Sequence, residues 1–515
     1  MKRREFLKTT GVTAAALFAG DVLFSRVVTA QDKKILQVAV SSDAWNLDVR
    51  KGTDVTGLNI CKQLYNGLMN YDPDGNMFAD LAEAAPEQPD DVTYIFKLRK
   101  GVQFHGGYGE MTAEDVVYSF DTIRGVGDQK GTFLSLWLRP LDKAEAIDSH
   151  TVKFTMKSPY GDFLDACTLC KIVSKNASEE RGKDFTRQPI GTGPFEFVEW
   201  VKDDHITLKR FDDYFTEGVP SLDGVYVQII PDDTVKVTNL ITGQVDMIKE
   251  IPPRNLAQLK QTPGIVVGQR TGTQCEQLYF NCAVEPFNDV NARRAVSYAI
   301  DRESIAEKVF FGMAQPAKAM LTEEQMPLKK FSDDMVNVNY DPEKAKGFLK
   351  ASSMPDGFEF TCMTTGQGWF VEQLTVMQAN LAEVGITMHI EPMEKSVMFG
   401  KMREGDYTAV YEDLNAAYFG YGAATPALFY TPPERWLNWK DDAGYAADEL
   451  LQKFVTTLDV NEGQVIFNQF LDIVLDQLPY TQVVFVDSTD AWKDSVTDYK
   501  TSLPNDSMWW NTKLG

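Results

Sequence analysis

The pattern of apolar and polar positions alternates between a strand-like period of two and a helix-like period of three to four residues. Strands are expected at Ile35–Val40, Val225–Ile230, Val245–Ile248, Phe358–Met363, Ile386–Ile390 and Tyr407–Tyr411. Helices are expected at Gly57–Met69, Asn291–Ile300, Val371–Glu383 and Glu462–Gln477. Alternation of this kind is typical of an α/β fold with parallel strands.

The stretch from Pro189 to Met247 has the clearest turn signals. It opens with Gly191-Thr-Gly-Pro194, where glycine permits positive φ and proline fixes the chain that follows. Residues that alternate on both sides of Asp203 predict a hairpin. A phosphate loop would need amides at the start of a helix, but this turn leads into a strand and no Gly-Lys-Ser/Thr follows. We therefore interpret it as a structural turn.

Polar and aromatic residues follow two of the predicted strands. Ser42 and Trp45 follow Ile35–Val40, while Gln367 and Trp369 follow Phe358–Met363 in a predicted βαβ unit. Ligands of α/β proteins bind beyond the carboxyl ends of such strands. These four residues are therefore candidates for a binding crevice, although Trp45 would equally suit plain core packing.

A further group of candidates follows the strand Tyr407–Tyr411. Asp413 is a candidate partner for a cation, and Asn415 for a hydrogen bond, as is Gln367. Tyr418 and Tyr421 stand among glycines and are typical of a wall on which a ligand stacks.

Several blocks of sequence resemble family 5 of the solute-binding proteins of ABC importers, which includes dipeptide-, oligopeptide-, opine- and nickel-binding proteins. The blocks are GTGPFEF at 191–197, RFDDYF at 210–215, SLDGVYVQIIPDDTVKVTNLITGQVDM at 221–247, LYNGLMNYDPDG at 64–75 and LYFNCAVEPFNDVNARRAVSYAIDRESI at 278–305. They occur in the order of the family and cover nearly the whole chain after residue 30.

The resemblance implies a two-lobed periplasmic-binding-protein fold with hinge strands and an extra small α+β module on the first lobe. The expected divisions are 31–70 with 190–270 and 485–515 for the first lobe, 71–189 for the module, and 271–484 for the second lobe. It also implies a monomer with no cofactor and no catalytic role. Such a receptor captures a small organic solute or peptide between its lobes and delivers it to the permease and ATPase subunits of an importer.

In the family, the small module borders the ligand pocket, and this implies roles for Trp137 in stacking and for Lys171 in pairing with an anion; a solvated lysine is the alternative. The family pattern GWGADYPDP carries an Asp that can bind a peptide amine. This chain has GYGAATP there, so Ala424 replaces that Asp. The departure weakens the peptide interpretation, unless Asp413 substitutes.

Composition and charge exclude one class of partner. The chain has 515 residues, 43% of them hydrophobic, which is enough material for more than one core. Its formal net charge is -23. Nucleic acid is not expected as a partner, because its phosphates repel a strongly acidic surface.

Residues 1–30 are expected to form an export signal. They contain the twin arginines Arg3 and Arg4, a mildly apolar stretch, and a possible cleavage site at Val28-Thr-Ala30. This pattern resembles a twin-arginine (Tat) signal. No cysteine lies near the site, so no lipid anchor is expected, and no later stretch reaches the ~18 apolar residues of a membrane span. The product should be soluble in the periplasm.

The cysteines and histidines bear on two functions that compete with a receptor for an organic solute, namely a receptor for a metal chelate and an enzyme. Cys167 and Cys170 form a lone CxxC, which suits buried thiols or a local disulfide better than a redox or metal site. Cys275 and Cys282 cannot pair if their strand is extended, because seven residues then separate them by over ~20 Å. A receptor for a metal chelate is the second hypothesis, although only four histidines are present. An enzyme is the third, and no GxSxG or HExxH motif supports it.

Overall fold

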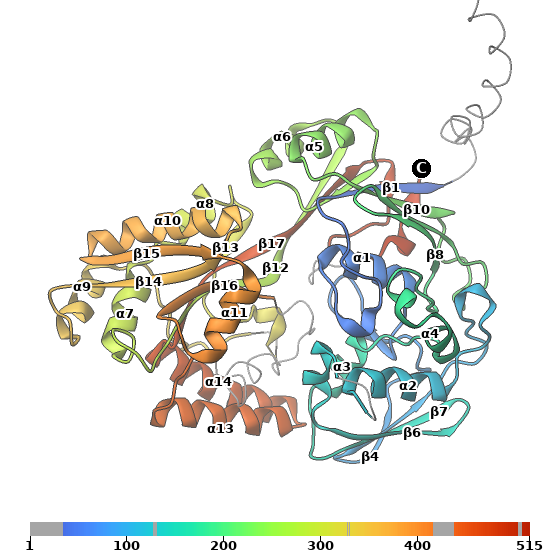
Figure 1. Cartoon of the computed structure of the whole chain (residues 1–515), viewed down its shortest axis with the longest axis horizontal. Coiled ribbons are helices and arrows are strands. Elements are labelled where there is room, and N and C mark those ends of the chain that lie inside the picture. The colour runs from blue at the N-terminus through green and yellow to red at the C-terminus, as the bar shows by residue number, and fades with distance from the viewer. Residues whose placement is uncertain (1–33, 127–130, 327, 329, 416–436, 503–506) are drawn as a thin grey trace, which may run out of the picture.

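The computed structural model describes residues 34–126, 131–326, 328, 330–415, 437–502 and 507–515. Figure 1 shows two bodies, one on each side of a pair of long strands, and we call them the first and the second lobe. The two strands are β12 (Ile265–Phe280) and β17 (Tyr480–Lys493), which pair antiparallel and are called the hinge strands below. The predicted two-lobed α/β organisation is therefore confirmed.

One mixed sheet crosses both lobes, in the order β15-β14-β16-β12-β17-β11-β1-β10-β9-β8. In the first lobe, β1 lies between β10 and β11 and is parallel to both, while β8 and β9 form the predicted hairpin. The elements of this lobe are β1 (Ile35–Val40), α1 (Val55–Leu64), β8 (Phe195–Val201), β9 (His205–Arg210), β10 (Gly224–Ile229), α5 (Asp233–Thr242), β11 (Met247–Lys249) and α6 (Leu256–Gln261).

In the second lobe, β14 and β15 are parallel neighbours joined by α10, which is the predicted βαβ unit. One face of this part of the sheet packs against α7 to α10, and the other against α11, α13 and α14. The elements are α7 (Val290–Ala299), α8 (Arg302–Lys308), β13 (Ala314–Pro316), α9 (Pro342–Ala351), β14 (Phe358–Thr365), α10 (Gly368–Glu383), β15 (Ile386–Met393), α11 (Lys395–Glu404), β16 (Ala409–Asn415), α13 (Asp442–Thr456) and α14 (Val460–Gln477).

A separate small sheet, in the order β4-β5-β7-β6, lies below the first lobe in Figure 1. Phe96, Phe154 and Phe163 pack ring against ring between this sheet and its helices. Thr112 and Asp115 form a capping box at the start of α2, as their spacing predicts. The elements are β2 (Met69–Tyr71), β3 (Met77–Ala79), β4 (Glu87–Asp90), β5 (Thr93–Lys97), α2 (Ala113–Arg124), β6 (Leu141–Asp148), β7 (Thr151–Met156), α3 (Phe163–Leu169) and α4 (Lys175–Arg181).

Short elements complete the fold. The 3-10 turns are η1 (Val49–Lys51), η2 (His105–Gly107), η3 (Phe133–Leu138), η4 (Gly182–Thr186), η5 (Pro253–Asn255), η6 (Glu323–Gln325) and η8 (Trp509–Asn511). Near the C-terminus, the short strands are β18 (Val496–Thr497) and β19 (Lys513–Leu514).

The Gly-Thr-Gly-Pro segment is a structural turn, as predicted, but the reason for its glycines is different. Neither Gly191 nor Gly193 has a positive φ. Both instead press against the end of α1: a Cβ on Gly191 would lie 2.1 Å from the carbonyl oxygen of Leu64, and one on Gly193 would lie 2.3 Å from that of Gln63. Close approach of two backbones, and not left-handed geometry, requires glycine here.

The buried side chain of His105 makes two hydrogen bonds to the backbone of this turn. Its Nε2 donates to the carbonyl oxygen of Gly193 (2.9 Å), and its Nδ1 accepts from the amide of Gly191 (3.4 Å), so the imidazole is neutral. Burial lowers the pKa of His105 to about 4.

We expect His105 to make the protein sensitive to acid. The unfolded chain takes up a proton near the ordinary histidine pKa of about 6.5, whereas the folded chain does so only near 4. The His105 share of the free energy of unfolding should therefore fall by about 2 kcal/mol between pH 7 and pH 5. Urea denaturation at both pH values should show this loss in the wild type and not in His105→Gln, whose amide does not titrate. Equal acid sensitivity in the two proteins would contradict this assignment.

The cysteines are free thiols, and Cys167 and Cys170 are buried. We favoured either buried thiols or a local disulfide for the CxxC pair. The structure has buried thiols, so the disulfide is wrong. Burial raises the pKa of Cys170 to about 12, so this thiol is inert toward redox chemistry at neutral pH.

Candidate functional site

A pocket of about 570 Å³ lies in the crevice between the two lobes, beside the hinge strands. We call it the crevice pocket. Its walls come from both lobes and its floor from the hinge strands themselves. The lining residues are Asp233, Thr234, Glu250–Asn255, Val309–Phe311, Met313, Gly368, Trp369 and Glu372, with Gly272–Gln274, Glu276 and Val486–Thr489 from the hinge strands.

The crevice pocket forms where strands of both lobes reach their carboxyl ends. The start of α5 follows β10, the loop that begins at Glu250 follows β11, and the start of α10 with Trp369 follows β14. Residues at these positions lie beyond the ends of the strands, where ligands of open α/β sheets bind. A solute held here would contact both lobes, so movement about the hinge strands would change its surroundings directly.

Acidic side chains dominate the charge of the crevice pocket. The carboxylates are Asp233, Glu250, Glu276, Glu372 and Asp487, and the only cationic side chain among the described lining residues is Arg254. Burial raises the pKa of Asp487 to about 6, because its carboxylate has lost much of its hydration.

Glu276 is the most deeply buried of these acids, with no exposed surface. It lies on β12 directly opposite Asp413 of β16. Gln274 donates weakly to its Oε1 (3.4 Å), and its Oε2 has no partner in hydrogen-bond geometry, although the buried amide of Gln373 lies near enough to lower its pKa. Burial, and then the like charges of Asp413 and Glu412, raise the pKa of Glu276 well above its ordinary value.

The neighbouring Glu412 has a cationic partner. Lys395, at the start of α11, places its Nζ 2.7 Å from Oε1 of Glu412. Burial and Asp413 nevertheless raise the pKa of Glu412. The end of β16 is thus a largely buried acidic region, and Lys395 forms an ion pair with one of its acids, Glu412.

Outside the hinge strands, described residues of the two lobes also make direct contacts. Arg254 of the first lobe lies 3.5 Å from Glu372 on α10, at the mouth of the crevice pocket. Far from there, the amide of Gly161 in the small module donates to the carbonyl oxygen of Val455 near the end of α13 (3.0 Å). The structure therefore shows the lobes in contact across the crevice.

The first-lobe residues expected at the site lie in varied surroundings. Ser42 is exposed and lies 3.3 Å from the Thr56 hydroxyl, and Trp45 is 74% exposed, so it is not a core residue. Trp137 packs in the first-lobe core, which leaves its ring almost no surface for stacking. Lys171 is buried, and its charge opposes the rise in the pKa of Asp80 that burial causes. The alternative of a solvated lysine is therefore wrong.

In the second lobe, Trp369 lines the crevice pocket and is 44% exposed. Gln367 is exposed at the residue before α10, and Asp413 is half-buried opposite Glu276. Asn415 ends β16, but its side chain lies outside the described residues, as do Tyr418, Tyr421 and Ala424.

Sequence reasoning missed Glu276, Asp487 and Arg254. Glu276 lies on β12 and Asp487 on β17, the strands that join the lobes, and buried charged residues are unusual there. A search for acidic residues inside the predicted hinge strands would have found Glu276.

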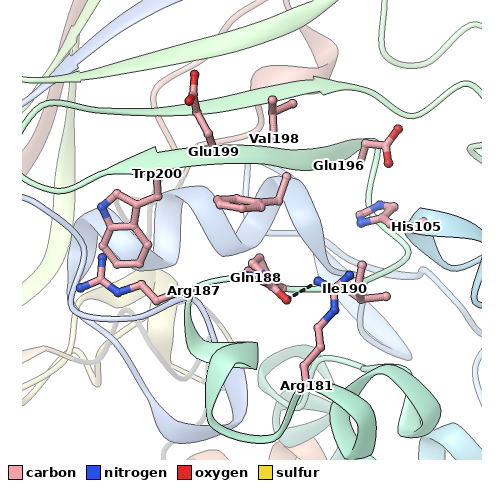
Figure 2. Close-up of a pocket in the computed structure, with 12 residues that line it drawn as sticks. His105, Arg181, Arg187, Gln188, Ile190, Glu196, Val198, Glu199 and Trp200 are labelled. Atoms are coloured by element: carbon pink, nitrogen blue, oxygen red, sulfur yellow. Dashed lines mark hydrogen bonds between the residues drawn. The ribbon is translucent and has the colours of Figure 1, made fainter.

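Figure 2 shows a second pocket, of about 480 Å³, lined only by residues that precede the hinge strands. Arg187 stacks on Trp200, with its guanidinium carbon 3.5 Å from the ring centroid. Arg181 donates to the carbonyl oxygen of Gln188 (2.7 Å), which is the dashed line in the view. Because no second-lobe residue lines this pocket, closure about the hinge would not enclose its contents, and the crevice pocket is the better candidate.

The described residues bear on two further kinds of function. They contain no group of three or more His, Cys, Asp or Glu side chains placed to hold a metal ion. Within the same ranges, no helix has the length and apolar character that crossing a membrane requires.

Comparison with known proteins connects this geometry to a family. The pattern of the bacterial extracellular solute-binding proteins, family 5 Middle, matches residues 76–449. The glutathione-binding protein GsiB of Pectobacterium atrosepticum is 29% identical over 495 residues, which are 93% of this chain and 92% of that protein.

Solved structures agree in fold. HbpA2 from Haemophilus parasuis superposes with a TM-score of 0.80 at 21% identity, over 93% of this chain and 100% of that one. The Agrobacterium protein AgaA in complex with agropinic acid gives 0.75 at 26% identity, over 93% and 99%. These matches confirm the two-lobed periplasmic-binding-protein fold. The chain therefore belongs to family 5 of the bacterial extracellular solute-binding proteins, the receptors that capture solutes for ABC importers.

Proposed function

We propose that this protein captures a small organic solute in the crevice between its lobes, in the periplasm, as a monomer with no catalytic step. The observation that carries the proposal is the crevice pocket, because both lobes and both hinge strands line it. Export would depend on residues 1–30, with cleavage after Ala30. The lobe divisions given above, at 70/71, 189/190, 270/271 and 484/485, are part of this proposal.

The geometry supports a clamp mechanism. A solute that contacts both walls gains more from the closed arrangement than from the open one, and this difference selects closure. Closure removes water, which strengthens each hydrogen bond and charge pair to the solute. The closed form would then dock on the permease of an importer, whose ATPase drives release.

Names of relatives suggest which solutes to try first. The similar proteins described above are a glutathione-binding protein and a protein solved with agropinic acid. Both names fit the expectation of a small organic solute or peptide. Trp369 and Asp413 are the predicted site residues that we retain for direct contact, because one lines the crevice pocket and the other lies opposite Glu276.

Native mass spectrometry of the mature chain, purified from periplasm without added solute, tests the receptor function. We expect a bound organic mass that is released intact on unfolding. Calorimetric titration should then give a dissociation constant in the micromolar range or tighter, that is, about -8 kcal/mol or more. A bound mass that carries nickel would instead establish a receptor for a metal chelate. Recovery of a chemically altered solute after incubation would establish an enzyme and overturn the proposal.

A further inference from the structure

We propose that the crevice pocket recognises a positively charged nitrogen of its solute, an amine or a guanidinium, and that Glu276 on β12 is the residue that receives it. This inference rests on the proposed function, because it names the chemical class of the solute captured in the crevice. The position differs from that of Ala424, where the family pattern has its acidic residue.

The first observation is a set of buried oxygens without partners around one pocket. Thr273, Glu276 and Asp487 all line the crevice pocket, and they are 4%, 0% and 8% exposed. Each has a side-chain oxygen that makes no hydrogen bond: Oγ1 of Thr273, Oε2 of Glu276 and Oδ1 of Asp487. Buried polar atoms are normally satisfied, so several unsatisfied acceptors at one place indicate a missing donor.

The second observation is the distribution of cations. Within the described residues, no lysine, arginine or histidine lies within 4 Å of the Glu276 carboxylate. The two nearby cations are engaged elsewhere, Lys395 with Glu412 and Arg254 with Glu372. Ionisation of a buried carboxyl group that has no counter-charge is costly. A cation that enters with the solute would supply the missing charge.

Nearby aromatic side chains suit the same class of solute. Trp369 and Phe311 line the crevice pocket, and they are 44% and 47% exposed. An exposed indole face attracts a cation and also covers the apolar carbon chain that carries it. The wall and the floor of the pocket therefore favour one solute chemistry, a cationic nitrogen on an apolar stem. An anionic solute with no cationic nitrogen would face five acidic side chains and one arginine.

The test uses matched probes and a matched pair of variants. The probes are glutathione and mannopinic acid, each compared with its N-acetylated form, which lacks the positive nitrogen. The variants are Glu276→Gln, which keeps the shape and removes the charge, and Glu359→Gln, which changes an exposed carboxylate of the same lobe. Calorimetric titration of the full mature protein measures the dissociation constants.

We expect at least one probe with a free cationic nitrogen to bind the wild type, and its N-acetylated form to bind at least 30-fold more weakly. Glu276→Gln should lose at least 30-fold in affinity for the free probe, while Glu359→Gln binds like the wild type. In the absence of any probe, Glu276→Gln should also melt at a higher temperature than the wild type, because the amide does not have to be held protonated against its ordinary tendency to ionise.

Other outcomes would overturn the cation assignment. These are equal binding of the free and acetylated forms, unchanged affinity in Glu276→Gln, or failure of every cationic probe to bind the wild type. An acidic or neutral solute recovered from periplasm would overturn it as well, yet would leave the receptor function standing. Recovery of a chemically altered solute would remove the receptor function itself.

Discussion

Replacement of Lys249 by methionine is expected to lower the free energy of unfolding by about 3–5 kcal/mol. Nζ of Lys249 lies 2.5 Å from Oδ1 of Asp490, and the two side chains are 3% and 0% exposed. They face each other across the pair β11–β17, where the first lobe joins a hinge strand. Methionine fills most of the same volume but leaves the Asp490 charge buried without its lysine, while the hydroxyl of Tyr499 still donates to it (2.7 Å).

Urea denaturation followed by circular dichroism measures this loss. Lys500→Met is the matched control, because Lys500 is 64% exposed and pairs with Asp74 on the surface, where an ion pair contributes about 0–1 kcal/mol. The double variant Lys249→Met with Asp490→Leu should recover part of the loss, since it removes both charges together. A loss below about 1 kcal/mol in Lys249→Met would contradict the view that Asp490 depends on this lysine.

Most of the fold could be predicted because its signals are local. The βαβ unit of β14, α10 and β15 follows from a change of hydrophobic period, and the hairpin of β8 and β9 from a turn between two alternating runs. The capping box at Thr112 needs only the residues of one helical turn. The lobe arrangement itself came from the family resemblance, because no local pattern shows that two strands cross between bodies.

The details that sequence reasoning missed depend on contacts between distant segments. Gly191 requires glycine because the end of α1, far earlier in the chain, presses on it. Lys171 is buried and acts on the charge of Asp80, and Trp137 lies in the core of the first lobe. Glu276 was overlooked for the same reason, since its burial and its acidic neighbour Asp413 arise only when β12 and β16 pair.

Replacement of Gly161 by leucine is expected to weaken solute binding by about 10- to 100-fold, with little change in the stability of the solute-free protein. Gly161 is exposed within its own module, yet a Cβ at this position would lie 2.8 Å from the carbonyl oxygen of Thr457 in the second lobe. The interlobe hydrogen bond from Gly161 to Val455 would then be lost as well. A bulky side chain therefore acts against the closed arrangement, and a penalty of about 1.4–2.8 kcal/mol on closure raises the dissociation constant by that factor.

The measurement pairs calorimetric titration of the recovered solute with small-angle scattering, which reports how far apart the lobes lie. Gly347→Leu is the matched control, because Gly347 is an exposed residue of α9. A Cβ added to it would have no atom within 4 Å, and leucine favours a helix. We expect the solute to reduce the radius of gyration of the control and of the wild type, but not of Gly161→Leu. Because the small module would then limit affinity without touching the crevice pocket, closure and solute contact would be separable contributions to binding. Wild-type affinity in Gly161→Leu would show instead that the solute is held without contact between the small module and α13.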